Sequence, residues 1–529
     1  MFKNTYLKRF SPILGLIVVL LLLLIFTEIA HAVIRNNKIS GNLTVGGKVL
    51  DFKISPDGQY TVFRGDVLEN DKNELFSVRT VGGPRVQLSI DLPDECGIGG
   101  FLITPDSQRV VYYGEGDNHC IILHSVPIGG GPSIELNQAY DDSYPSNIRV
   151  TNDSANVLFV LVSSETRQRK LYRVPIIGGP IQPISSAWYV GIIEYEITPN
   201  NQSVIYVQDP WPNPGNKELF KASLVGDHTP RSLEVGEIDR FVKISPDGAY
   251  VIYRKHTGSG YELFSIPIES YPVSPIKLNG TLVAGGSVSS FQITPDSAYV
   301  VYKADETTRY MNLLYRAPVN GSTHRIPLIT DTFADPLKSV YLFEISSDGQ
   351  WVVFSGDLEM DNRYDLYSVS INGGTKERLN KGMIDTGDVI NFKISPNSIG
   401  VVFIASYYFV GVNELFAVNM AGNWGVRLNT DLPPGGNVSN FRISNNSQNV
   451  VYRADQEIDS VFNLYVVPST GGTTYKINPE MVPGGSVRLY QITPNDRGVV
   501  YLADQDVDTV DELFITYDYD VNYLPLVIR

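Results

Sequence analysis

One short phrase recurs ten times along this chain of 529 residues, at intervals of 47 to 52 residues. Clear copies read FKISPDGQYTVF from Phe52, FQITPDSAYVVY from Phe291 and FRISNNSQNVVY from Phe441. A fixed period of this length identifies a repeat architecture. The copies align on the Ile or Val before each turn, at Ile54, Ile103, Val150, Ile197, Ile244, Ile293, Ile345, Ile394, Ile443 and Ile492.

Each repeat carries four strand-like runs of four to eight residues, rich in Val, Ile, Phe and Tyr and bounded by Gly, Pro, Asn or Asp. One repeat reads VSNFRIS, QNVVYRA, FNLYVVP and TTYKIN, from Val438, Gln448, Phe462 and Thr473. The first turn is Ser-Pro-Asp-Gly in its fullest form, and these residues suit successive positions of a β-turn. Four antiparallel strands per repeat predict the blade of a β-propeller. We therefore expect an all-β chain of ten four-stranded blades.

The repeat resembles the TolB-like or WD40-like repeat of exported bacterial proteins. The resemblance rests on the I-[ST]-P-[DN]-[GSD] turn and on the later ELFSV or NLYVV strand, at 74–78 and 463–467. It covers nearly the whole chain after residue 32 and implies a propeller. That family hosts periplasmic translocation components, peptidase-associated propellers and many proteins of unknown role, so the resemblance implies no single activity.

The two ends of the repeat region predict how the ring closes. The last repeat runs through its third strand at 512–515, with no partner equivalent to 475–478. Residues 37–40 precede Val45-Gly46-Gly47 just as 277–279 precede 284–286. We therefore expect an N-terminal strand to complete the last blade of one closed ring, which removes exposed sheet edges. The alternative is two smaller rings, divided near the longest interval, 293 to 345.

The first 32 residues are typical of a secretory signal peptide. Lys3, Lys8 and Arg9 form a positive n-region, an apolar run spans 13–26, and an A-x-A exit ends at Ala32. The apolar run is short for a membrane span, and an uncleaved N-terminal anchor is the alternative. We expect the rest of the chain to be exported, to the extracellular space, the cell surface or the periplasm. We expect the propeller to span 33–518, followed by a short tail at 519–529 and no hydrolase domain.

Charge narrows the classes of partner. The chain has 57 acidic and 42 basic residues, a net charge of −15. Such a surface repels nucleic acid and anionic membranes. We expect a protein or peptide ligand, no nucleic acid, and membrane contact only if the N-terminal segment stays uncleaved.

Acidic loops between the second and third strands are the best chemical signal. They read Asp504-x-Asp506-x-Asp508, Asp455-x-Glu457-x-Asp459 and Asp357-x-Glu359-x-Asp361. Alternating oxygen ligands collect hard cations such as Ca²⁺, although no loop has the spacing of an EF-hand. We favour a solvated hairpin whose leading Asp caps the turn. Calcium is the alternative and the one cofactor candidate. The loops share a face with Gly-rich loops at 46–47, 285–286, 435–436 and 484–485.

Other catalytic signals are absent from the sequence. It has no G-x-S-x-G, HExxH or Walker loop. We expect no catalytic metal centre, because the histidines beyond residue 32 fall in loops of different faces, at His119, His124, His228, His256 and His324.

The chain has two cysteines, Cys96 and Cys120. Both belong to the second repeat, at the same end of the blade. Exported proteins mature under oxidising conditions, so we expect a disulfide between them, worth about 3 kcal/mol in the chain-entropy model. The alternative is two thiols too far apart to be joined.

These observations favour an exported, non-catalytic propeller that binds a protein or peptide, and we expect no enzyme. One alternative is a carboxylate-dependent propeller enzyme, a lyase or glycosidase, with acids meeting across the ring mouth. Another is a carbohydrate-binding propeller, although the four tryptophans do not recur in register. A deep pocket with two carboxylates of raised pKa would favour the enzyme, and a broad shallow face would favour the binding module.

Overall fold

The computed structural model describes residues 35–517, with breaks at 93–95, 117–121, 138–142, 186–190, 210–214, 259, 271–273 and 332–337. The predicted signal peptide at 1–32 and the tail at 519–529 lie outside the described residues. The described part forms ten antiparallel four-stranded sheets and no helix. Accordingly, no helix within it has the length and hydropathy to cross a bilayer. The expected ten-bladed β-propeller is confirmed.

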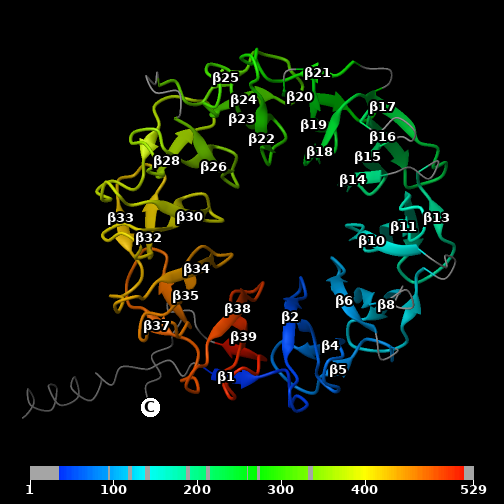
Figure 1. Cartoon of the computed structure of the whole chain (residues 1–529), viewed down its shortest axis with the longest axis vertical. Helices are drawn as coiled ribbons and strands as arrows, with labels where there is room; N and C mark the ends of the chain where they lie inside the picture. The colour runs from blue at the N-terminus through cyan, green and yellow to red at the C-terminus, as the bar shows by residue number, and fades with distance from the viewer. Residues whose placement is uncertain are drawn as a thin grey trace, which may run out of the picture.

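The ten sheets are the blades of one ring around a central channel (Figure 1). The first strand of each blade lies innermost, and the second strand packs outside it (Figure 1). The first strands are β2 (Val49–Ile54), β6 (Cys96–Ile103), β10 (Ser143–Val150), β14 (Gly191–Ile197), β18 (Ile238–Ile244), β22 (Val288–Ile293), β26 (Val340–Ile345), β30 (Val389–Ile394), β34 (Val438–Ile443) and β38 (Val487–Ile492). The second strands are β3 (Tyr60–Gly65), β7 (Arg109–Gly116), β11 (Asn156–Ser163), β15 (Ser203–Asp209), β19 (Tyr250–His256), β23 (Tyr299–Ala304), β27 (Trp351–Gly356), β31 (Gly400–Ala405), β35 (Asn449–Ala454) and β39 (Gly498–Ala503).

The third and fourth strands complete each blade toward the outside of the ring. The third strands are β4 (Glu74–Arg79), β8 (Leu123–Pro127), β12 (Arg169–Pro175), β16 (Glu218–Ser223), β20 (Tyr261–Pro267), β24 (Leu313–Pro318), β28 (Asp365–Ser370), β32 (Glu414–Asn419), β36 (Asn463–Pro468) and β40 (Glu512–Tyr517). The fourth strands are β5 (Val86–Gln87), β9 (Ile134–Glu135), β13 (Gln182–Pro183), β17 (Arg231–Val235), β21 (Ile276–Lys277), β25 (Ile326–Pro327), β29 (Glu377–Arg378), β33 (Gly425–Arg427), β37 (Tyr475–Lys476) and, in the last blade, β1 (Arg35–Lys38). We number the blades 1 to 10 from β2 to β38.

The ring closes as the sequence predicts. β1 pairs with β40, with Asn37 opposite Ile515 and Lys38 opposite Phe514. The Ile39 N–H then donates to the Leu513 carbonyl at 2.7 Å. The last sheet therefore takes its outer strand from the start of the repeat region, and β2 lies beside β38 (Figure 1).

An aromatic pair marks the centre of every blade. Side chains of the second and third strands stand opposite each other in register and stack, as Phe63 does on Phe76 at 5.5 Å. The pair recurs in all ten blades, with Tyr112 and His124 in blade 2. Burial of rings of this size contributes much of the packing energy of a blade. These pairs place Phe and Tyr side chains of the second and third strands at the centre of each blade.

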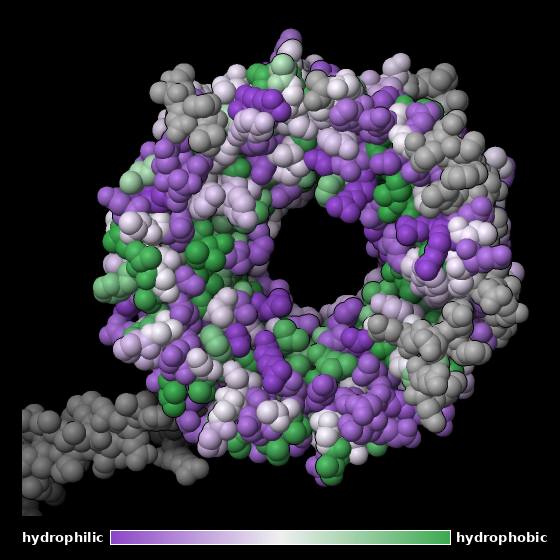
Figure 2. Space-filling view, in the orientation of Figure 1, coloured by the Kyte–Doolittle hydropathy of each residue, from purple (hydrophilic) through white to green (hydrophobic). Residues whose placement is uncertain are grey.

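The hydrophobic core lies between neighbouring blades as well as within them. One cluster joins Phe52 and Phe63 of blade 1 to Val500 and Leu513 of blade 10 across the closure. Polar side chains add to this packing along the channel. The Lys53 ammonium donates to Phe101 O at 2.7 Å in the next blade, and Gln491 donates to Phe52 O at 3.2 Å across the closure. The channel wall is therefore both polar and apolar (Figure 2).

The turns between first and second strands, which we call the 1–2 turns, also connect neighbouring blades by hydrogen bonds. Their last residue has positive φ in every blade: Gly58, Ser107, Ser154, Asn201, Gly248, Ser297, Gly349, Ser398, Ser447 and Asp496. Glycine adopts this conformation without strain. Where the residue is serine, its hydroxyl accepts a backbone N–H from the preceding blade, as Ser107 does from Asp57 at 3.0 Å. The variable end of the repeated phrase therefore joins one blade to the next.

Candidate functional site

The second strand begins at a position that is aromatic in several blades and glycine in blades 8 and 10. Tyr60, Tyr250, Tyr299 and Trp351 occupy it in β3, β19, β23 and β27. These rings pack against the hydrophobic clusters between blades. In β31 the position is Gly400, which has no side chain to place there.

The ring of Tyr60 shows what the missing side chain would fill. Its hydroxyl lies 3.2 Å from where a Cβ on Gly129 would stand, in the turn between third and fourth strands (the 3–4 turn) of blade 2. Thr470 holds the corresponding place in blade 9, since each residue is the second after the proline that ends its third strand. Between blades 8 and 9 this space is therefore left open.

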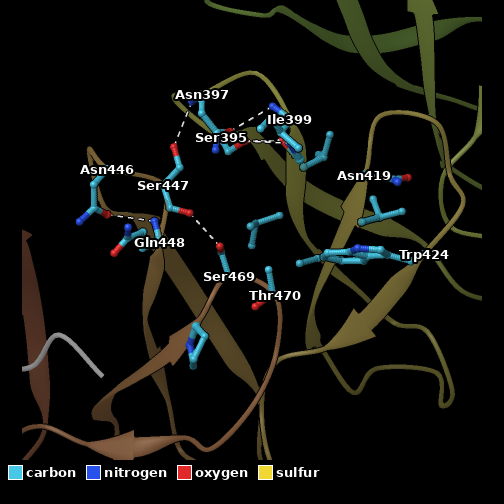
Figure 3. Close-up of a pocket in the computed structure, with 16 residues that line it drawn as sticks. Ser395, Asn397, Ile399, Asn419, Trp424, Asn446, Ser447, Gln448, Ser469 and Thr470 are labelled. Atoms are coloured by element: carbon cyan, nitrogen blue, oxygen red, sulfur yellow. Dashed lines mark hydrogen bonds between the residues drawn. The ribbon is translucent and has the colours of Figure 1, made fainter. Parts of the chain in front are cut away.

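The open space is a pocket of about 840 Å³ (Figure 3). That volume is typical of a small-molecule site. Its walls come from the 1–2 and 3–4 turns of blades 8 and 9 (Figure 3). Ile399, Val401, Val402, Val418 and Pro468 supply apolar surface.

Trp424 gives the pocket an aromatic wall. It lies in the 3–4 turn of blade 8, just before β33, and is 43% exposed. Figure 3 shows its indole on one side of the pocket, with Asn446 and Gln448 on the other. A half-exposed indole can stack on a flat ligand and donate one hydrogen bond from its nitrogen.

The polar lining of the pocket consists of amides and hydroxyls without a charged side chain. The Asn397 side-chain oxygen accepts from the Ser395 hydroxyl at 2.7 Å and from Ile399 N at 3.1 Å. The Asn446 oxygen likewise accepts from Gln448 N at 2.9 Å. Both amide nitrogens lack a hydrogen-bond partner within the described part of the chain, and they remain available as donors.

Hydrogen bonds across the blade boundary hold these turns in place. Asn397 N donates to the Ser447 hydroxyl at 3.0 Å, from blade 8 to blade 9. The Ser469 hydroxyl donates to Ser447 O at 2.7 Å. Ser447 thus joins three of the four turns that line the pocket, so its walls are preformed.

The acidic loops predicted as calcium sites lie on the opposite face. The leading carboxylate of each trio caps its loop: Asp504 accepts from Ser486 N at 2.6 Å and from Thr509 N at 3.2 Å. Asp455 makes both equivalent bonds, and Asp357 makes the first. This is the capping role that the sequence favours for the leading Asp.

Four other acids of the trios form ion pairs with basic side chains. The pairs are Asp506 with Lys38 at 3.3 Å, Glu457 with Lys476 at 2.9 Å, Glu359 with Arg378 at 3.1 Å, and Asp361 with Lys338. Asp459 and Asp508 complete the predicted set at the loop tips. Among the residues that the structure describes, no three acidic, His or Cys side chains gather in a way that could hold a metal ion. Calcium binding stays a prediction.

The carboxylates with raised pKa lie outside the pocket. Burial raises the pKa of Asp511 to about 6, although its Oδ1 lies 2.7 Å from Arg488 Nε. Burial also raises the pKa of Glu306 and of Glu512. The pocket between blades 8 and 9 is therefore not the two-carboxylate pocket expected of the enzyme alternative.

Cys120, one half of the predicted disulfide, lies outside the described residues, and so does His119. Cys96 begins β6 and is buried. The bridge stays a prediction. Of the other histidines, His124 stacks on Tyr112 at 5.4 Å, and burial lowers its pKa. The His228 ring bonds Ser223 O at 2.8 Å. These contacts give both residues structural roles.

Sequence reasoning missed the pocket itself. Its two decisive residues are Gly400 and Trp424, and neither belongs to a motif. An alignment of the second-strand starts shows glycine at Gly400 and Gly498 where four other blades carry an aromatic ring, and only the 3–4 turn of blade 8 adds a tryptophan.

No family model matches the chain, and no match is found among curated proteins. Several solved structures are similar over much of the chain. One of two prolyl endopeptidases matches at 10% identity and a TM-score of 0.38, over 79% of this chain and 56% of that one. An oligogalacturonate lyase in complex with manganese matches at 12% and 0.35, over 64% and 96%. Prolyl oligopeptidase B from Galerina marginata matches at 9% and 0.39, over 69% and 55%.

These likenesses correct one expectation and leave others open. The structures matched are those of enzymes, so the expectation that this chain is not an enzyme is withdrawn. At these identities and TM-scores they assign no activity. The alignment spans little more than half of either peptidase. The fold defines a ten-bladed β-propeller, and the likeness to TolB-like repeats stays a resemblance.

Proposed function

We propose that the pocket between blades 8 and 9 binds a neutral saccharide. The observation that carries the proposal is the combination of a half-exposed indole with an uncharged polar lining in a preformed pocket.

The indole of Trp424 suits the apolar side of a sugar. A pyranose ring presents C–H groups on its faces and hydroxyls at its rim. The C–H face can stack on the indole, which offers a large rigid apolar surface at little entropic cost. The rim then faces Asn446 and Gln448 across the pocket.

The polar lining suits hydroxyl groups. A sugar hydroxyl both donates and accepts, and the amide nitrogens of Asn397 and Asn446 are donors, while Thr470 offers a hydroxyl. A charged ligand would lose its hydration without gaining an ion pair, which is costly. The site therefore selects neutral sugars over uronates.

The test is calorimetric titration of the purified chain with neutral cello-, malto- and chito-oligosaccharides and with a uronate oligomer of equal length. We expect binding of a neutral sugar, and at least tenfold weaker binding by Trp424→Ala, since loss of an aromatic anchor that the ligand covers costs about 2 kcal/mol or more.

Phe409→Ala is the matched control, because Phe409 is also an exposed aromatic residue but lies in a loop of the opposite face. Binding that survives Trp424→Ala, or a preference for the uronate, would contradict the proposal.

A carboxylate-dependent reaction is a second candidate, and Asp511 is the observation that favours it. Its pKa of about 6 suits a general acid or base near neutral pH. It lies beside Arg488, a half-exposed residue of the innermost strand β38. Release of reducing ends from the same oligosaccharides, lost in Asp511→Asn, would support this candidate. Turnover equal in Asp511→Asn and wild type would exclude it.

A further inference from the structure

An apolar side chain occupies the same place in the 2–3 loops of four consecutive blades. These loops join the second and third strands. Met360, Phe409, Ile458 and Val507 each stand three residues after the first loop residue, in blades 7, 8, 9 and 10. They are 38%, 67%, 62% and 55% exposed. We call these four residues the apolar arc.

The fold does not require apolar residues at this place. Glu69 holds it in blade 1 and Thr308 in blade 6. Those loops have the same length and join second and third strands that pair in the same register. The arc is therefore an added property of one side of the ring, and hydrophobic surface that serves no packing marks an interaction site.

The arc is widest at blade 8. There Tyr408 and Val410 flank Phe409 and are 48% and 68% exposed. Tyr407 fixes the base of this loop, since its ring packs on Phe416 at 4.6 Å and its hydroxyl donates to Lys381 O. The apolar tip is thus presented on an anchored loop.

Acids border the arc in the blades on either side of blade 8. The flanking pairs are Glu359 and Asp361, Glu457 and Asp459, and Asp506 and Asp508. Several pair with basic residues of the same face, but Asp459 and Asp508 have no basic side chain within ion-pair distance among the described residues. In blades 7, 9 and 10 an acid thus stands on each side of the apolar residue, while the loop of blade 8 holds no acid.

We propose that the apolar arc docks a cationic, apolar segment of another protein, one whose Lys or Arg residues alternate with large apolar side chains. Apolar residues would cover the arc while the basic residues meet Asp459 and Asp508. Charge complementarity of this kind sets the choice of partner and speeds association.

Charge also disfavours the other occupants of such a surface. A second copy of this chain, with a net charge of −15, would bring the same acids face to face in a symmetric contact. An anionic membrane is repelled for the same reason. A basic segment is attracted by the same acids that repel a second copy of the chain or an anionic membrane.

The experiment measures fluorescence anisotropy of a labelled peptide of Lys-Leu-Lys repeats titrated with the whole chain. Peptides of Glu-Leu-Glu and Lys-Ser-Lys repeats test the charge and the apolar content separately. We expect binding of the first peptide alone, weakened by salt. Phe409→Ser and Ile458→Lys should each lower its affinity about tenfold.

Ile177→Ser is the control, because Ile177 is 70% exposed and lies in the 3–4 turn of blade 3. It should bind as wild type does. Equal affinity in Phe409→Ser and wild type, or equal binding of Glu-Leu-Glu, would overturn the proposal. So would a wild-type dimer in sedimentation that Phe409→Ser makes monomeric, or Phe409-dependent binding to phosphatidylcholine vesicles.

Discussion

At the scale of single residues, one glycine turns a packed contact between blades into a cavity. A blade that carries Tyr or Trp at the start of its second strand fills the gap to the next blade. Gly400 leaves this gap open, and Trp424 lines it. The difference between a core position and a binding site is here the side chain of a single residue.

Gly400→Tyr should therefore close the pocket without unfolding the ring. The added Cβ would stand 3.3 Å from Val418 O, a tight contact that other blades accommodate. We expect loss of saccharide binding with a change in unfolding free energy below about 1.5 kcal/mol. Calorimetry and urea denaturation measure the two effects.

Gly498→Tyr provides the comparison, because Tyr517 stands opposite Gly498 and bonds Thr80 O in blade 1 at 3.0 Å. We expect overpacking there, with a loss of about 1–3 kcal/mol. Retained saccharide binding in Gly400→Tyr would show that the ligand binds elsewhere.

Asp511 should give the ring a dependence on pH. Its pKa rises from 3.8 to about 6 on folding, so the folded chain takes up a proton between these values. The protonated carboxyl of Asp511 therefore contributes stability to the folded ring below about pH 4, and this stability is lost as pH rises toward 6. Thermal unfolding of wild type and Asp511→Asn at several pH values checks this.

The melting temperature of the wild type should fall relative to that of Asp511→Asn as pH rises from 4 to 6. Parallel curves for the two proteins over that interval would mean that Asp511 does not titrate there.

At the scale of the element, the 1–2 turn both shapes a blade and joins it to its neighbour. Its last residue needs positive φ, and a serine there also accepts a hydrogen bond from the preceding blade. Ser447 does this for the pocket wall through Asn397 N.

Ser447→Ala should destabilise the ring more than Ser447→Gly. Both variants leave Asn397 N without its acceptor, which costs about 1 kcal/mol. Alanine keeps the strain of positive φ that Ser447 already bears, whereas glycine relieves it, which offsets about 1 kcal/mol of the loss. Urea denaturation measures the difference, and equal stabilities would mean that the backbone relaxes.

Much of the strand and turn structure could be predicted from the sequence. Each innermost strand ends at the Ile or Val on which the repeats align, from Ile54 to Ile492, because strand, turn and strand follow local rules. The capping role of Asp504 was predicted on the same basis. Local chemistry sufficed because all its partners lie within one repeat or the loop beside it.

The pocket could not be predicted, because it depends on a contact between repeats. It forms because Gly400 of blade 8 has no side chain to reach Thr470 of blade 9, 70 positions later in the sequence. The lack of recurring tryptophans counted against a sugar site, but a single pocket needs only Trp424. The apolar arc could not be predicted for a related reason, since Ile458 and Val507 each stand between two acids in the sequence and only the fold brings the four loops to one side of the ring (Figure 1).

At the scale of the whole molecule, the ring depends on β1. This strand completes the four-stranded sheet of blade 10: Asn37 pairs with Ile515, and Ile39, just after the strand, is buried in the cluster between blades 10 and 1. Without it, β40 would present an open edge, and neighbouring blades would lose packing.

Asn37→Pro should therefore weaken the entire ring. Proline removes a backbone donor from the β1–β40 ladder and costs about 3 kcal/mol or more in regular structure. We expect a lower melting temperature and earlier proteolysis of blade 10. Asn37→Ala, which keeps the N–H, should behave as wild type. Equal behaviour of the two variants would show that β1 is dispensable.

The pairing of the chain's two distant ends also sets a schedule for its synthesis. The Ser40 hydroxyl accepts the N–H of Leu513, 473 positions later. A ribosome adding about 5–20 residues per second needs roughly half a minute to a minute and a half to make that stretch. Throughout that time β1 has emerged but its partner strand does not yet exist. The first strand to be made is thus the last to find its place, and every earlier blade must persist as part of an open arc until it does.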